Sequence, residues 1–190
     1  RIRNHRLMRS VFDIFFSLLV LSIIFSCTSG NKYKKEIALL DAIHVILSRT
    51  DSLLNAADTT SAEKYSEEIV SDFSFINKNA GDTLSKEAAL LLETYNGIEI
   101  SFKKSLRLIF VLKKNVVYSQ NQANALMNDI KKNLADEQYL KSFAAKEMKS
   151  AEIIYKNAQI AVASMKTNIS QFDSLNSEVK NFIDAIRTKK

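Results

Sequence analysis

Residues 140–186 read LKSFAAKEMKSAEIIYKNAQIAVASMKTNISQFDSLNSEVKNFIDAI. Apolar side chains recur at every third or fourth position throughout this stretch, the spacing that places them along one face of an α-helix. The stretch contains neither glycine nor proline, the residues that most often interrupt a helix. With Asp136 as its start, we predict one helix of about 50 residues, or roughly 75 Å at 1.5 Å per residue.

The same spacing of apolar residues continues upstream and predicts three further helices. They cover approximately residues 32–54, 60–79 and 84–134. A run of Ser, Gln and Asn at 118–122 leaves open whether the third of these helices is continuous. If it is, it approaches the length of the last helix.

Helix ends are expected where capping residues occur. Thr60 and Glu63 have the capping-box spacing, so Thr60 is the expected N-cap of the second helix. Gly81 suits the left-handed position after that helix. Asp82 or Thr83 is the expected N-cap of the third helix.

These helices predict an all-α fold, an elongated antiparallel bundle of about four helices in which the last two form a long coiled-coil-like hairpin. Residues 106–118 are apolar on most sides, as is typical of a helix surrounded by neighbours. We therefore place them in a four-helix section, where the first two helices cover part of the hairpin. Residues 32–190 form a single domain in this interpretation.

The N-terminal segment has a different pattern, that of a secretory signal peptide. Four arginines precede an apolar run at 11–25, and a small residue, Ser26, stands before Cys27. This arrangement resembles the lipobox of bacterial lipoproteins. The resemblance implies a signal peptide at 1–26, diacylglycerol and acyl chains on Cys27, and a short tether at 27–31. Met8 is a possible start of translation.

The resemblance also implies a location. Neither an Asp directly after Cys27 nor an acidic cluster at 28–32 is present, which implies a bacterial envelope protein facing the periplasm, at the outer membrane if the cell is Gram-negative. Two alternatives remain open for the apolar run. It is an uncleaved anchor, although it falls short of the ~20 residues that span a bilayer, or it is an ordinary signal peptide with a chance cysteine.

Composition restricts the function further. The formal net charge is +6, but removal of residues 1–26 leaves 23 basic and 20 acidic side chains, a net charge of +3. This balance does not predict a nucleic-acid-binding protein. Cys27 is the sole cysteine, so the domain folds without disulfides.

Charge is segregated along the chain. Residues 28–99 carry a net charge of −5, and residues 100–135 carry +6, with Asp129 as the only acid. We define the basic strip as Lys103, Lys104, Arg107, Lys113 and Lys114. The strip is a candidate contact for a partner or an anion, such as lipid phosphates, anionic glycans or an acidic protein. We expect instead that it pairs internally with the acidic face of the second helix, which carries Glu63, Glu67, Glu68 and Asp72.

No pattern indicates catalysis. The sequence has no Gly-rich phosphate loop and no nucleophile with a paired base, and His44 is the only histidine after the signal segment. One histidine does not make a metal site by itself, so we expect His44 at the edge of the core. We predict a non-enzymatic, membrane-anchored binding or spacer module for a protein or cell-wall partner, with no metal and no cofactor besides the covalent lipid. The alternatives are a single-span inner-membrane adaptor and a self-associating structural coiled coil.

Overall fold

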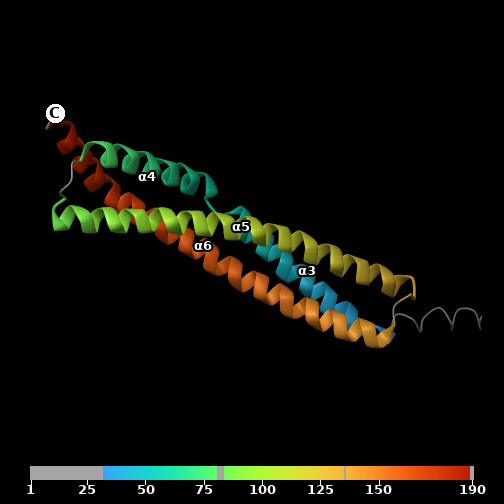
Figure 1. The fold of residues 1–190 in the computed structure, drawn as a ribbon. Coiled ribbons are helices and arrows are strands. Elements are labelled where there is room, and N and C mark those ends of the chain that lie inside the picture. The colour runs from blue at the N-terminus through green and yellow to red at the C-terminus, as the bar shows by residue number, and fades with distance from the viewer. Residues whose placement is uncertain (1–31, 81–83, 135, 189–190) are drawn as a thin grey trace, which may run out of the picture.

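The computed structural model describes residues 32–80, 84–134 and 136–188. These residues form four α-helices and no strand (Figure 1). The helices are α3 (Lys34–Asn55), α4 (Thr59–Asn79), α5 (Lys86–Lys131) and α6 (Glu137–Thr188). The prediction of an all-α, elongated bundle is confirmed, and α5 is continuous through 118–122. Cys27, its signal segment and tether, and Gly81 lie outside the described residues.

The α5–α6 hairpin is the long element of the fold, and α3 and α4 lie end to end along it (Figure 1). Each short helix packs on both long helices. At the start of the bundle, Lys32 Nζ lies 3.8 Å from Glu137 Oε2. In the other half, Lys180 Nζ lies 2.7 Å from Asp72 Oδ1. The two residues of the first pair are 105 positions apart in sequence, and those of the second pair are 108 apart. Because this separation is nearly constant, α3 and α4 run in the same direction as α6 and keep nearly the same offset along it.

The bundle therefore has three helices in cross-section, and the predicted four-helix section is wrong. The reason is the connection at 56–58, which interrupts the helix without reversing the chain. Asp58 is the N-cap of α4, and its Oδ1 accepts a hydrogen bond from Ser61 N at 3.0 Å. The predicted cap at Thr60 is thus two residues too late. Leu54 before the break and Ala62 after it are both fully buried, so the apolar stripe resumes beyond the connection.

The other helix starts follow the same chemistry. Asp136 accepts a hydrogen bond from Tyr139 N at 2.9 Å, which confirms Asp136 as the start of the last helix. Ser85, rather than Asp82 or Thr83, caps α5 by accepting from Ala88 N at 3.2 Å. At the α5–α6 turn, Asn133 adopts φ 53°, a left-handed conformation that Asn tolerates better than most residues.

The core is a continuous seam of aliphatic side chains that thickens into an aromatic layer in the α4 half. Tyr65 and Phe172 stack with ring centroids 4.1 Å apart, and Tyr95 stacks on the same phenylalanine at 5.8 Å. Phe172 and Tyr95 are buried, at 2% and 0% exposure. This layer joins α4, α5 and α6.

A three-helix cross-section leaves one side of every helix open to solvent. Residues 106–118 are therefore not enclosed as predicted, since Phe110, Val117 and Tyr118 are each more than half exposed. None of the described helices contains a stretch long and apolar enough to span a membrane.

Candidate functional site

The basic strip lies in the middle third of α5. Lys103, Lys104 and Arg107, together with Leu108 and Val111, line an open groove of about 420 Å³. These five residues recur at intervals of three and four, so they occupy one side of the helix. Lys113 and Lys114 lie farther along α5, and Lys113 is half-buried.

The predicted pairing of the strip with the second helix is wrong. In the described part of the chain, no α4 carboxylate lies within ion-pair distance of a strip cation. Lys103 pairs instead with Glu99 of its own helix at 2.5 Å. The carboxylates of Glu68 and Asp72 turn toward α6, where they share Lys180.

Apolar side chains are interleaved with the strip on the same exposed side of α5. We call this surface the outer face of α5, and it comprises Ile100, Lys103, Lys104, Arg107, Phe110, Val111, Lys114, Val117 and Tyr118. The Lys114 ammonium lies 4.3 Å from the centroid of the Phe110 ring, a cation–π contact. No acidic residue occurs at 100–128.

A second groove lies between α5 and α6, next to the end of the outer face. It measures about 280 Å³, and its lining is formed by Asn115, Tyr118, Ser119, Glu147, Ser150, Ile153 and Ile154. Ser119 Oγ donates a hydrogen bond to Glu147 Oε2 at 2.9 Å. Tyr118 belongs to both surfaces, so the two are continuous.

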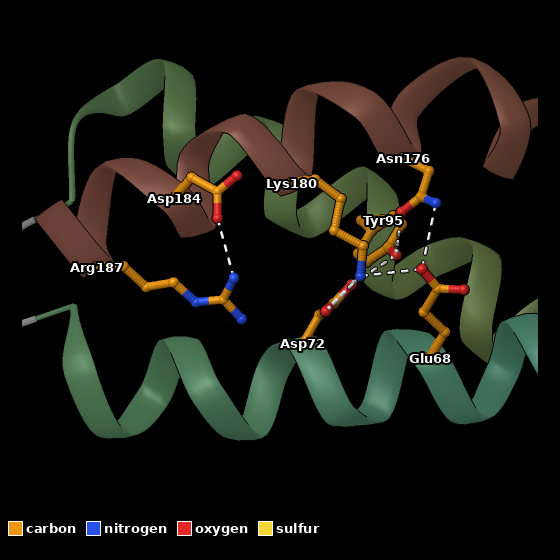
Figure 2. Close-up of polar contacts among 7 residues, drawn as sticks. All are labelled: Glu68, Asp72, Tyr95, Asn176, Lys180, Asp184 and Arg187. Atoms are coloured by element: carbon orange, nitrogen blue, oxygen red, sulfur yellow. Dashed lines mark hydrogen bonds and ion pairs between the residues drawn. The ribbon is translucent and has the colours of Figure 1, made fainter.

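A polar cluster that the sequence analysis did not identify lies in the α4 half of the bundle (Figure 2). Lys180 Nζ contacts Asp72 Oδ1 and Oδ2 at 2.7 and 2.8 Å and Glu68 Oε1 at 2.9 Å. The Tyr95 hydroxyl donates to Asp72 Oδ2 at 3.0 Å and also faces Asn176 Oδ1 at 3.2 Å. Asn176 Nδ2 donates to Glu68 Oε1 at 3.3 Å. The cluster thus joins α4, α5 and α6.

The protonation states in this cluster follow from burial and charge pairing. Burial, then the nearby charge of Asp72, raise the pKa of Tyr95, so its hydroxyl stays protonated and acts as a donor. Burial of Glu68 opposes ionisation, but hydrogen bonds from Lys180 and Asn176 outweigh it and lower the pKa of Glu68. Burial of Lys180 is likewise outweighed by its hydrogen bonds to Asp72 and Glu68, which raise its pKa. The arrangement is suited to clamping helices together, and we call these five residues the clamp.

Beyond the clamp, α4 and α6 are joined near their C-terminal ends. Arg187 Nη1 pairs with Asp184 Oδ1 at 3.0 Å on α6 (Figure 2). The guanidinium also lies 5.1 Å from the Phe75 ring of α4. Both members of the ion pair are largely exposed, so the pair itself adds little stability.

His44 is half-buried on α3. Among the described residues, no group of His, Cys, Asp and Glu side chains has the arrangement of a metal site. No family model matches this chain, and neither does any curated protein or any solved structure.

Proposed function

We propose that this chain is a lipid-anchored, non-enzymatic helical bundle of the bacterial cell envelope that serves as a binding or spacer module for a protein or cell-wall partner. The lipobox-like segment that ends in Cys27 supports the anchor. Two acyl chains or more on one cysteine suffice for stable attachment, whereas one chain gives only marginal binding.

One observation supports the proposal most directly. The first described residues lie at one end of the rod-shaped bundle. In the Lys32–Glu137 pair, the first described residue lies beside the α5–α6 turn. Cys27 precedes Lys32 by five residues, which reach at most ~18 Å when extended. The α5–α6 turn is then the anchored end of the rod. The opposite end carries the C-terminal part of α6, after 52 helical residues or about 78 Å.

Metabolic labelling with a palmitate analogue in a bacterial host tests the anchor. We expect label on the wild-type chain, none on Cys27→Ser, and an unprocessed precursor when signal peptidase II is inhibited. A chain that stays in the membrane unlabelled and unshifted would instead support the single-span adaptor. A labelled Cys27→Ser variant would refute attachment at this cysteine.

A self-associating coiled coil is the second candidate, because apolar side chains such as Ile153 and Ile160 on α6 are exposed at 51% and 56%. Exposed apolar surface of this kind often marks a protein interface. Sedimentation of residues 32–190 over a range of concentrations separates the two. We expect a monomer, and a concentration-dependent oligomer would favour self-association.

A further inference from the structure

We propose that the outer face of α5 is a membrane-contact surface for anionic lipid headgroups. The bundle then lies along the bilayer, with α5 facing the lipid. This inference deepens the proposed function by defining which side of the anchored bundle faces the membrane, and it favours a binding module over an upright spacer. Its test does not depend on Cys27.

The first argument for the proposal is the charge of this face. Four cations stand on the outer face, and of these only Lys103 has a carboxylate within ion-pair distance in the described structure. The groove at Lys103, Lys104 and Arg107 brings three cations next to the apolar side chains of Leu108 and Val111. A lipid headgroup offers the matching chemistry, a phosphate next to hydrocarbon. Juxtamembrane Lys and Arg clusters bind anionic leaflets through this attraction.

The apolar residues of the face supply the second argument. Phe110 and Tyr118 are exposed at 58% and 64%. Phe110 stands one turn from both Arg107 and Lys114, and Tyr118 stands one turn beyond Lys114. Aromatic rings of this kind favour the headgroup region of a bilayer. Because Phe110 is more than half exposed, packing in the core does not explain an aromatic residue at this position. Burial of these side chains at the lipid interface removes apolar surface from water.

The shape of the face distinguishes a bilayer from an acidic protein as the occupant. The nine residues come from one continuous helix and extend over 100–118, about 27 Å. A long strip on the side of a rod matches a flat surface. The groove between α5 and α6 shares only Tyr118 with this face, so most of the face lies outside the kind of groove that holds a partner helix. Arg107 lies 24 residues before the end of α5, about 36 Å from the anchored end. A rod lying flat brings the anchor and the strip to the membrane together, and such paired signals give stable binding.

The experiment is co-sedimentation of residues 32–190 with phospholipid vesicles. Every buried core residue of the described structure lies within 33–186, so this chain retains the whole core. We expect binding to vesicles of phosphatidylcholine mixed with phosphatidylglycerol, and at least about tenfold weaker binding to phosphatidylcholine alone. Added salt should weaken the binding because the charges are exposed.

Two variants and one control make the test specific. Replacement of Lys103, Lys104, Arg107 and Lys114 by Gln should reduce affinity for the anionic vesicles at least about tenfold. The control replaces four exposed lysines of α6, Lys146, Lys149, Lys156 and Lys166, by Gln and removes the same charge. It should retain binding to within about threefold. Unchanged helicity by circular dichroism excludes unfolding as the cause.

The apolar part of the face is tested by Phe110→Ser with Tyr118→Ser, which keeps every charge. We expect this variant to bind anionic vesicles more weakly than the wild-type bundle. The proposal is overturned if the wild-type bundle does not bind these vesicles, or if the α6 control loses as much affinity as the α5 variant. It is also overturned if the strip binds an acidic protein but does not bind lipid. Absence of palmitate labelling on the wild-type chain would refute the lipid anchor at Cys27. It would not affect the result of the vesicle-binding experiment.

Discussion

Tyr95→Phe removes one hydroxyl from the clamp and leaves the rest of the ring in place. The ring is fully buried against Phe172, and its hydroxyl donates to the Asp72 carboxylate at 3.0 Å. Hydrogen bonds to charged groups contribute about 1.5–3 kcal/mol. Asp72 keeps both bonds from Lys180, so the lower part of this range applies. We expect a loss of about 1.5–2 kcal/mol, or roughly 3–8 °C in Tm for a domain of this size.

The pH dependence of the loss gives this prediction its sharpest test. The pKa of Tyr95 in the folded chain lies above its ordinary value of 10.0, because burial and Asp72 disfavour the phenolate. A raised folded-state pKa contributes stability that is fully present below the unfolded pKa and is lost as the pH rises above it. Wild type therefore loses this contribution above pH 10, whereas the Tyr95→Phe variant has no hydroxyl to ionise. The stability difference between the two proteins should shrink in alkaline solution.

Urea unfolding followed by circular dichroism, at neutral pH and above pH 10, measures both effects. Tyr139→Phe is the matched control, since Tyr139 is 55% exposed and should change stability by less than about 0.5 kcal/mol. Equal stabilities of Tyr95→Phe and wild type at neutral pH would refute the clamp. A difference that stays constant or widens above pH 10 would refute the assigned titration.

Four further substitutions, at three positions, test other parts of the bundle. Phe172→Ala deletes the centre of the aromatic layer and should cost about 3–5 kcal/mol, read from the urea midpoint. Asn168→Leu should stabilise by about 1 kcal/mol in the same assay, because the buried Asn168 Nδ2 has no partner among the described residues. Asn133→Gly should leave the thermal midpoint nearly unchanged, whereas Asn133→Val should lower it through a loss of about 1 kcal/mol, because the φ of 53° disfavours a branched side chain.

Helix content and helix extent were predictable from sequence because they depend on local spacing. The stripe at 140–186 predicted a helix of about 50 residues, and α6 has 52. Asp136 was identified as its start for a local reason as well, since a cap bonds to an amide three residues away. Asp58 satisfied the same rule at α4, but the capping-box spacing of Thr60 and Glu63 favoured the wrong residue.

The arrangement of α3 and α4 was not predictable in this way. A three-residue connection is compatible with a reversal of the chain or with a continuation. The outcome depends on how α3 and α4 both pack on α6, which is a long-range fit. The four-helix section and the enclosure of residues 106–118 were wrong for the same reason. Exposure of that stretch is the property on which the membrane-contact proposal depends.

The residues of the clamp form a pattern in the sequence, but the spacing of apolar residues used to predict the helices does not reveal it. Glu68 and Asp72 are four residues apart, and so are Asn176 and Lys180. The two acids lie on one face of their helix, and Asn176 and Lys180 lie on one face of theirs, so a polar contact between the two helices could have been predicted. The buried Tyr95 completes it, although its position in the apolar stripe indicated only a core residue. Cys27 and its lipid remain predictions.

The end-to-end order of α3 and α4 also determines how the bundle responds to force. α3 begins at one end of the rod, and α6 ends at the other (Figure 1). Tension between an anchor and a partner held at the far end would act parallel to the helix axes. Such a load shears the packed side chains of the whole seam together rather than peeling one helix away turn by turn. The clamp at Lys180 crosses that direction of sliding, so it would be among the contacts that resist the pull.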